Sequence, residues 1–201
     1  MSDDRFAHDS FFVDQLIRPL ANLYRISTLG SDQASAGEPV AFVRQKKLAI
    51  KEDFRFFADE TESEELFRLR ARQVFDVRGR YNVTTPEGEP IGALEKVFGI
   101  SLLRSTWRIY GPDQQHLATA RERSMPVAFL RRAIDFVPYG EFVPVLFQFT
   151  ILMDDREVGE FIRPVGFRDR YVMKLGGDPD RHIDRRVAIG LAIALDALQS
   201  R

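Results

Sequence analysis

Cysteine is absent from the 201-residue chain, which excludes disulfides, thiolate metal ligands and a cysteine nucleophile. An excess of charge of one sign is lacking as well, because 29 lysines and arginines nearly balance 30 aspartates and glutamates. The resulting net charge of −1 argues against bulk electrostatic binding to nucleic acid. A local basic patch is still compatible with that balance.

Hydrophobic runs long enough to cross a bilayer are also missing. The longest apolar run, residues 187–195, has nine residues, whereas a spanning helix needs about 20. The first four residues include Asp3 and Asp4, where a secretory signal requires a cationic start. We therefore expect a soluble cytoplasmic protein without a transmembrane span, which meets membranes only at their periphery.

Catalytic signatures are not found either. The sequence has no G-x-S-x-G elbow, no Walker loop, no G-x-G-x-x-G and no H-E-x-x-H. The three histidines, His8, His116 and His182, lack the spacing of a metal site. Neighbouring carboxylates such as Asp154 and Asp155 fit turns better than an acid–base pair. The sequence predicts no catalytic residue, no metal site and no cofactor.

Hairpin-like units, in contrast, recur along the chain. In each unit aromatic and aliphatic residues alternate with polar ones, a turn follows, and an aliphatic residue is then succeeded by a small one. The units are residues 81–83 with 91–94, 107–109 with 117–120, 149–151 with 158–161, and 24–26 with 40–42. Period-two alternation puts the apolar side chains on one face of a strand. The small residues Gly92, Ala118 and Gly159 suit a bulge or a close backbone approach.

The remaining segments give weaker patterns. Residues 67–72 alternate strictly and residues 171–175 are typical of a late strand. Residues 48–57 and 127–137 allow either a strand or a helical turn. Residues 60–65 are expected to form an acidic loop. Residues 11–23 have partly helical spacing, which Pro19 interrupts.

The C-terminal part predicts a helix over about residues 181–199, with Asp180 placed as its cap. Residues 187–195 are apolar on every face, so this helix is expected to be buried all round. Hairpins must bury their shared face in a sandwich or a barrel, and a helix inside a closed sheet satisfies both elements. We expect a mostly β fold: a closed barrel of about ten to twelve antiparallel strands around this helix. Residues 1–22 are expected to form a partly helical or extended N-terminal segment, and residues 23–201 the barrel domain.

Several stretches form a pattern that goes beyond strand periodicity. They are residues 75–77, 81–88, 91–92, 103–107, Gly159, 169–171 and 184–198. The pattern resembles the LURP-one-related, scramblase-like branch of the tubby C-terminal-like family, from about residue 23 to the end. The resemblance implies a barrel closed on a central C-terminal helix, and a relation to proteins that bind phosphoinositides or act at membranes. The acidic calcium loop, cysteine-rich segment and membrane tail of scramblases have no counterpart here, and no functional residue is transferred.

Basic residues gather on one predicted strand and beside it. Three arginines of residues 67–72 share the face opposite the apolar side chains, and arginine binds phosphate groups in a bidentate manner. The candidate site for an anionic lipid or phosphate comprises Arg68, Arg70, Arg72, Arg78, Arg80, Lys46 and Lys47. The competing interpretation is a solvated strand face whose charges are balanced by Glu62, Glu64 and Glu65.

The sequence thus favours a non-enzymatic binding module, with anionic lipid or a membrane surface as the first candidate ligand. One alternative is a protein-interaction or structural domain, which contacts a partner through the barrel exterior or through Phe6, Phe11 and Phe12. A second alternative is an enzyme of unfamiliar type. Nucleic acid is not expected as a partner.

Overall fold

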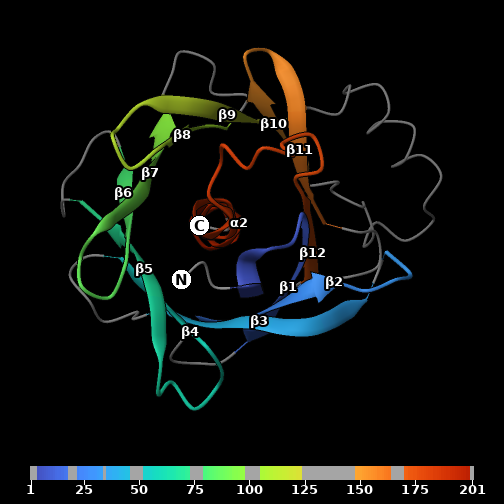
Figure 1. Ribbon diagram of the computed structural model, residues 1–201, viewed down its shortest axis with the longest axis vertical. Helices are drawn as coiled ribbons and strands as arrows, with labels where there is room; N and C mark the ends of the chain where they lie inside the picture. Colours follow the sequence, from blue (N-terminus) through green and yellow to red (C-terminus); the bar gives the residue numbers. More distant parts are fainter. Residues whose placement is uncertain are drawn as a thin grey trace, which may run out of the picture.

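A closed antiparallel barrel surrounds one helix in the computed structural model of the chain (Figure 1). The structure describes residues 4–17, 22–33, 35–45, 52–72, 79–97, 105–123, 148–163 and 170–199. The described elements are η1 (Asp4–Phe6), β1 (Ser10–Ile17), β2 (Asn22–Leu29), β3 (Ala36–Gln45), β4 (Asp53–Phe57), β5 (Glu65–Ala71), β6 (Arg80–Thr84), β7 (Pro90–Val97), β8 (Thr106–Tyr110), β9 (His116–Glu122), β10 (Gln148–Met153), β11 (Arg156–Ile162), β12 (Arg170–Lys174) and α2 (Arg185–Gln199). Each strand pairs with its sequence neighbours, and β1 pairs with β12 to close the barrel. The predicted fold class is confirmed, with twelve strands among the described residues.

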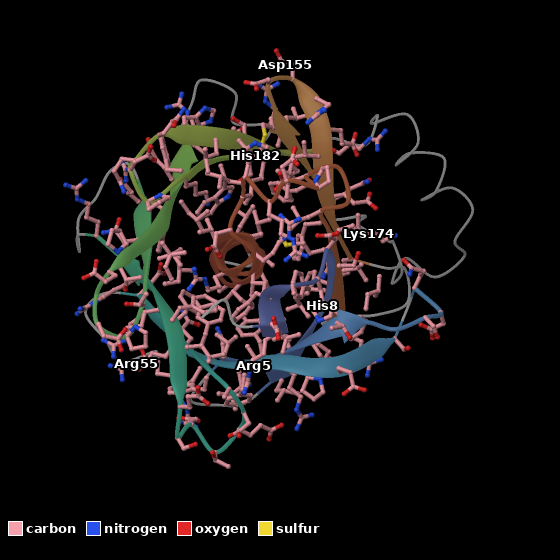
Figure 2. The ribbon with its side chains drawn as sticks, viewed as in Figure 1. Arg5, His8, Arg55, Asp155, Lys174 and His182 are labelled. Atoms are coloured by element: carbon pink, nitrogen blue, oxygen red, sulfur yellow. The ribbon has the colours of Figure 1, made fainter. Side chains whose placement is uncertain are left out.

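The four predicted hairpins are all present, as β2–β3, β6–β7, β8–β9 and β10–β11. Each has a register shift close to its turn, directly after Ile26, Val83, Ile109 and Ile151 respectively. In the last three hairpins, the predicted small residue (Gly92, Ala118 or Gly159) lies opposite that aliphatic residue on the neighbouring strand. A Cβ atom at Gly159 would lie 2.5 Å from the carbonyl oxygen of Lys174, which confirms the predicted close approach. Asp155 lies at the tip of the β10–β11 hairpin (Figure 2).

The barrel begins earlier in the sequence than predicted, at strand β1. The sequence placed an N-terminal segment at residues 1–22, but residues 10–17 pair with both β2 and β12. Phe11, Phe12 and Val13 are all buried, so strand pairing on both sides, not the partly helical spacing, determines the structure here. Phe6 also lies in the core, with its ring 5.7 Å from that of Phe67. The N-terminal residues from Phe6 to the end of β1 are therefore part of the barrel domain.

The structure describes only part of the segments whose sequence pattern allowed either a strand or a helical turn. Residues 53–57 form β4, which resolves the later part of segment 48–57 as a strand. The acidic segment of residues 60–65 precedes β5, which takes Glu65 as its first residue. Residues 127–137 lie outside the described residues.

Helix α2 runs through the centre of the barrel (Figure 1). Its apolar residues 187–195 are at most 2% exposed, which confirms the prediction of a helix buried on every face. Small residues let the wall come close to it. A Cβ atom at Gly92 would lie 2.7 Å from Cγ2 of Val187, and one at Gly190 would lie 3.7 Å from Cγ2 of Val83.

The helix begins at Arg185, later than predicted, because residues 178–184 form capped turns. Arg181 has a positive φ of 55°, which an α-helix does not allow. The carboxylate of Asp178 accepts the backbone N–H groups of His182 and Ile183, each at 3.0 Å. Asp184, not the predicted Asp180, caps α2, since its Oδ1 accepts the N–H of Arg186 at 2.8 Å.

A buried ion pair fixes the first turn of α2. The guanidinium of Arg185 donates to Asp178 at 2.8 Å and to Asp9, just before β1, at 2.7 Å. Burial opposes the ionised form of Asp178, but hydrogen bonds from Ile183, Arg185 and His182 outweigh burial and lower the pKa of its carboxyl group. The contact connects the helix to the strand that closes the barrel.

A second buried polar group fixes the last turns of α2. Asp196 is 5% exposed, and its carboxylate accepts hydrogen bonds from the hydroxyls of Tyr24, at 2.8 Å, and Tyr171. Burial, together with the charge of Asp196, raises the pKa of Tyr24 far above its ordinary value. Hydrogen bonds thus hold α2 near both ends: Arg185 binds Asp178 and Asp9 at its start, and Asp196 binds β2 and β12 near its end.

Replacing Ile189 or Ile193 with Asp is expected to abolish folding. Both side chains are at most 1% exposed, and an unpaired buried charge removes a large share of the about 5–15 kcal/mol that stabilises a typical domain. Circular dichroism during heating measures the effect, with Ile193→Val as the matched control that should still melt cooperatively. A soluble, cooperatively melting Asp variant would contradict the buried helix.

The domain is expected to lose stability as the pH rises above about 10, where an unfolded tyrosine ionises. Folded Tyr24 keeps its proton at that pH, so the unfolded state binds fewer protons and the free energy of unfolding falls. Tyr24→Phe should make this fall shallower. Urea unfolding at several alkaline pH values measures the slope, and Ile26→Val on the same strand should retain the wild-type slope. Equal slopes for both variants would refute this role of Tyr24.

Candidate anion-binding site

The predicted arginine row lies on the outer face of β5, as the alternation indicated. Phe67 and Leu69 are fully buried, so Arg68 and Arg70 project from the opposite face. Arg68 lies opposite Arg55 of β4 and Arg70 opposite Asp53. Figure 2 shows Arg55 at the outside of the wall.

Carboxylates on the same face neutralise part of this row. Glu65 binds Arg68 with both oxygens, one of them 3.1 Å from Nη2, and this hydrogen bond raises the pKa of the Arg68 guanidinium. Arg55 lies 3.6 Å from Asp53 and 3.7 Å from Glu65. Arg70 forms no ion pair with any described residue. The balancing role expected of Glu65 is therefore observed.

Among the other predicted basic residues that the structure describes, Arg80 lies apart from this row. The backbone N–H of the exposed Arg72 donates to the carbonyl of Arg80 at 2.9 Å. The Arg80 guanidinium hydrogen-bonds Gln114, lies 3.9 Å from Glu95 and stacks 4.7 Å above the ring of Tyr110. Arg80 therefore belongs to the neighbouring surface over β6–β8. Lys46, Lys47 and Arg78 lie outside the described residues.

That neighbouring surface contains a groove on the outer face of β7, β8 and β9. Its volume is about 400 Å³, within the range of small-ligand sites. It is lined by Val97, Thr106, Arg108, Tyr110, His116, Thr119 and Arg121. Two of these seven side chains are cationic and none is acidic. We call this site the β8 groove.

The register of β8 and β9 places four side chains of the β8 groove at the corners of a square, in which arginine and threonine alternate. Arg108 of β8 lies opposite Thr119 of β9, and Thr106 of β8 lies opposite Arg121 of β9. The two arginines thus occupy diagonal corners, with a hydroxyl beside each. Both arginines are exposed, and neither forms an ion pair within the described ranges. Two guanidinium groups and two hydroxyls therefore share one small surface.

The rim of the β8 groove is held by specific contacts. Nε2 of His116 lies 3.1 Å from Oγ1 of Thr119, and the His116 ring packs edge-on against Tyr110. The Tyr110 hydroxyl donates to Glu95 at 2.9 Å. Since Glu95 also faces Arg80, its carboxylate already has two partners next to Arg108. The aromatic rim is fixed by these contacts.

The sequence contained only part of the signal for this groove. Alternation in residues 106–110 places Arg108 on the outer face, and His116 is the first residue of β9. Which arginine lies opposite which threonine depends on the bulge after Ile109, and periodicity does not give a bulge's position. The groove was therefore missed.

The described residues contain neither a metal-ion cluster nor a membrane-spanning helix. No group of three histidine, aspartate or glutamate side chains there is arranged to hold a metal ion. No described helix combines the length and apolar character needed to cross a bilayer.

Comparison with known proteins shows which family the chain belongs to. No curated protein matches it. The family model described as LURP-one-related matches residues 40–196, a span that includes β4 to β12 and most of α2. The chain therefore belongs to the LURP-one-related family.

Proposed function

We propose that this protein is a non-enzymatic binding module that contacts anionic lipid at a membrane surface through the outer face of its barrel. The observation that carries the proposal is the β8 groove, where Arg108 and Arg121 face a lining without carboxylates. Arginines near an anionic membrane contribute about 1 kcal/mol each to binding. In this proposal the protein acts in the cytoplasm, at the periphery of a membrane.

The filled interior of the barrel supports an external site. Side chains of α2 and the strands form one continuous core from Phe6 to Ala197 among the described residues, which favours a site on the outer wall.

The geometry at His116 favours binding over catalysis. His116 and Thr119 lie within hydrogen-bond distance, as a general base and a hydroxyl nucleophile do. Such a base is normally oriented by a third group. No described carboxylate or carbonyl bonds to His116, so the arrangement fits a hydroxyl held for ligand contact.

Vesicle co-sedimentation tests the proposal. We expect the protein to bind vesicles containing phosphatidylserine or a phosphoinositide and not neutral vesicles. Binding should weaken between about 0.1 M and about 0.5 M salt, because salt screens exposed charges. Arg68→Gln, Arg70→Gln and Arg72→Gln combined should reduce binding less than Arg108→Gln with Arg121→Gln, since Glu65 already neutralises part of the first set.

Other outcomes of the vesicle experiment would contradict the proposal. Equal sedimentation with neutral and anionic vesicles, or none with either, would contradict lipid binding. A protein partner recovered with wild type but not with the Arg108 and Arg121 variant would instead assign the same face to protein recognition.

A further inference from the structure

We infer that the β8 groove is a site for a single phosphate monoester group, an inference that rests on the proposed binding function of this face. The juxtaposition that supports it is the pair Arg108 and Arg121 at diagonal corners, alternating with the hydroxyls of Thr106 and Thr119. Guanidinium groups form forked, charge-assisted bonds to phosphate oxygens. Hydroxyls beside them supply donors to the remaining oxygens.

The charges around the groove limit the size of the ligand. Along one row of the outer face, Arg108 is followed on β7 by Glu95. Along the next row, Arg121 is followed by Thr150 of β10 and then Glu160 of β11. A carboxylate therefore bounds the positive surface on each side. This pattern suits one compact dianion and opposes a long polyanion such as nucleic acid.

The contacts at the rim hold the side chains of the β8 groove in place for a phosphate monoester. Thr119 has its hydroxyl within 3.1 Å of His116 Nε2, which restricts its rotation. The Tyr110 ring is fixed by His116 and Glu95, and Val97 adds an apolar side chain. The aromatic and apolar side chains provide a surface for the carbon skeleton that carries the phosphate.

The site and its chemistry are tested in solution with the full chain. The probe is glycerol 3-phosphate, a monoester, compared with dimethyl phosphate, a diester of lower charge. Binding is followed through the arginine Nε–Hε signals in nuclear magnetic resonance spectra. We expect the monoester to bind about tenfold more tightly than the diester, since each charge-assisted hydrogen bond is worth about 1.5–3 kcal/mol, or tenfold and more.

Matched variants test whether the monoester binds in the β8 groove. Arg108→Gln with Arg121→Gln should weaken monoester binding by about tenfold or more. Arg70→Gln with Arg156→Gln is the control, because both residues are exposed outside the groove and the change in net charge is the same. Equal weakening by the two double variants, equal binding of monoester and diester, or no shift of any arginine signal would overturn the inference.

A vesicle experiment separates the two possible sources of the phosphate. Phosphatidic acid presents a monoester at a lipid surface, and phosphatidylglycerol presents a diester. Preference for phosphatidic acid, lost in the Arg108 and Arg121 variant only, supports a lipid ligand. Binding of glycerol 3-phosphate without vesicle binding keeps the monoester site and refutes the membrane function. Vesicle binding that falls equally in both double variants keeps the membrane function and refutes the site.

Discussion

The burial of α2 is the constraint on which the rest of the structure depends. A helix without a polar face must be surrounded completely, and a single sheet does so only by closing. Each wall strand therefore turns an apolar face inward, and Gly92 lets the wall approach Val187. The polar contacts described for the helix lie near its two ends, where Arg185 binds Asp178 of the preceding turn and Asp196 binds Tyr24 of β2.

This constraint also explains where function can reside. In the described part of the chain, the helix and the inward side chains of the strands fill the barrel interior, unlike barrels whose lumen holds a ligand. The outer face is free of the packing requirement, because its side chains alternate with those that make the core. The β8 groove is built from such outward residues, and Trp107 and Ile109, between them in sequence, are fully buried.

The sequence predicted the architecture well because the features that determine it are periodic. Alternation identified the four hairpins, and the apolar stretch identified the helix. It left β1 outside the barrel, because Phe12, Leu16 and Leu20 are spaced like a helix face although tertiary pairing makes residues 10–17 a barrel strand. It also failed at the groove, since Arg108 and Arg121 come together through strand register. The arginine row at Arg68 and a carboxylate at Glu65 to balance it were both predicted from the sequence, and the fold shows the contact between them.

The pairing of β1 with β12 has a consequence for synthesis on the ribosome. Residues 10–14 find their partners only at residues 170–174, and the helix that fills the interior follows still later. Until β12 and α2 have been synthesised, the nascent wall has an unpaired edge and an uncovered apolar lining, both of which promote aggregation. Such long-range closure is slow. The closing strand and the helix therefore decide whether the preceding strands become a folded barrel.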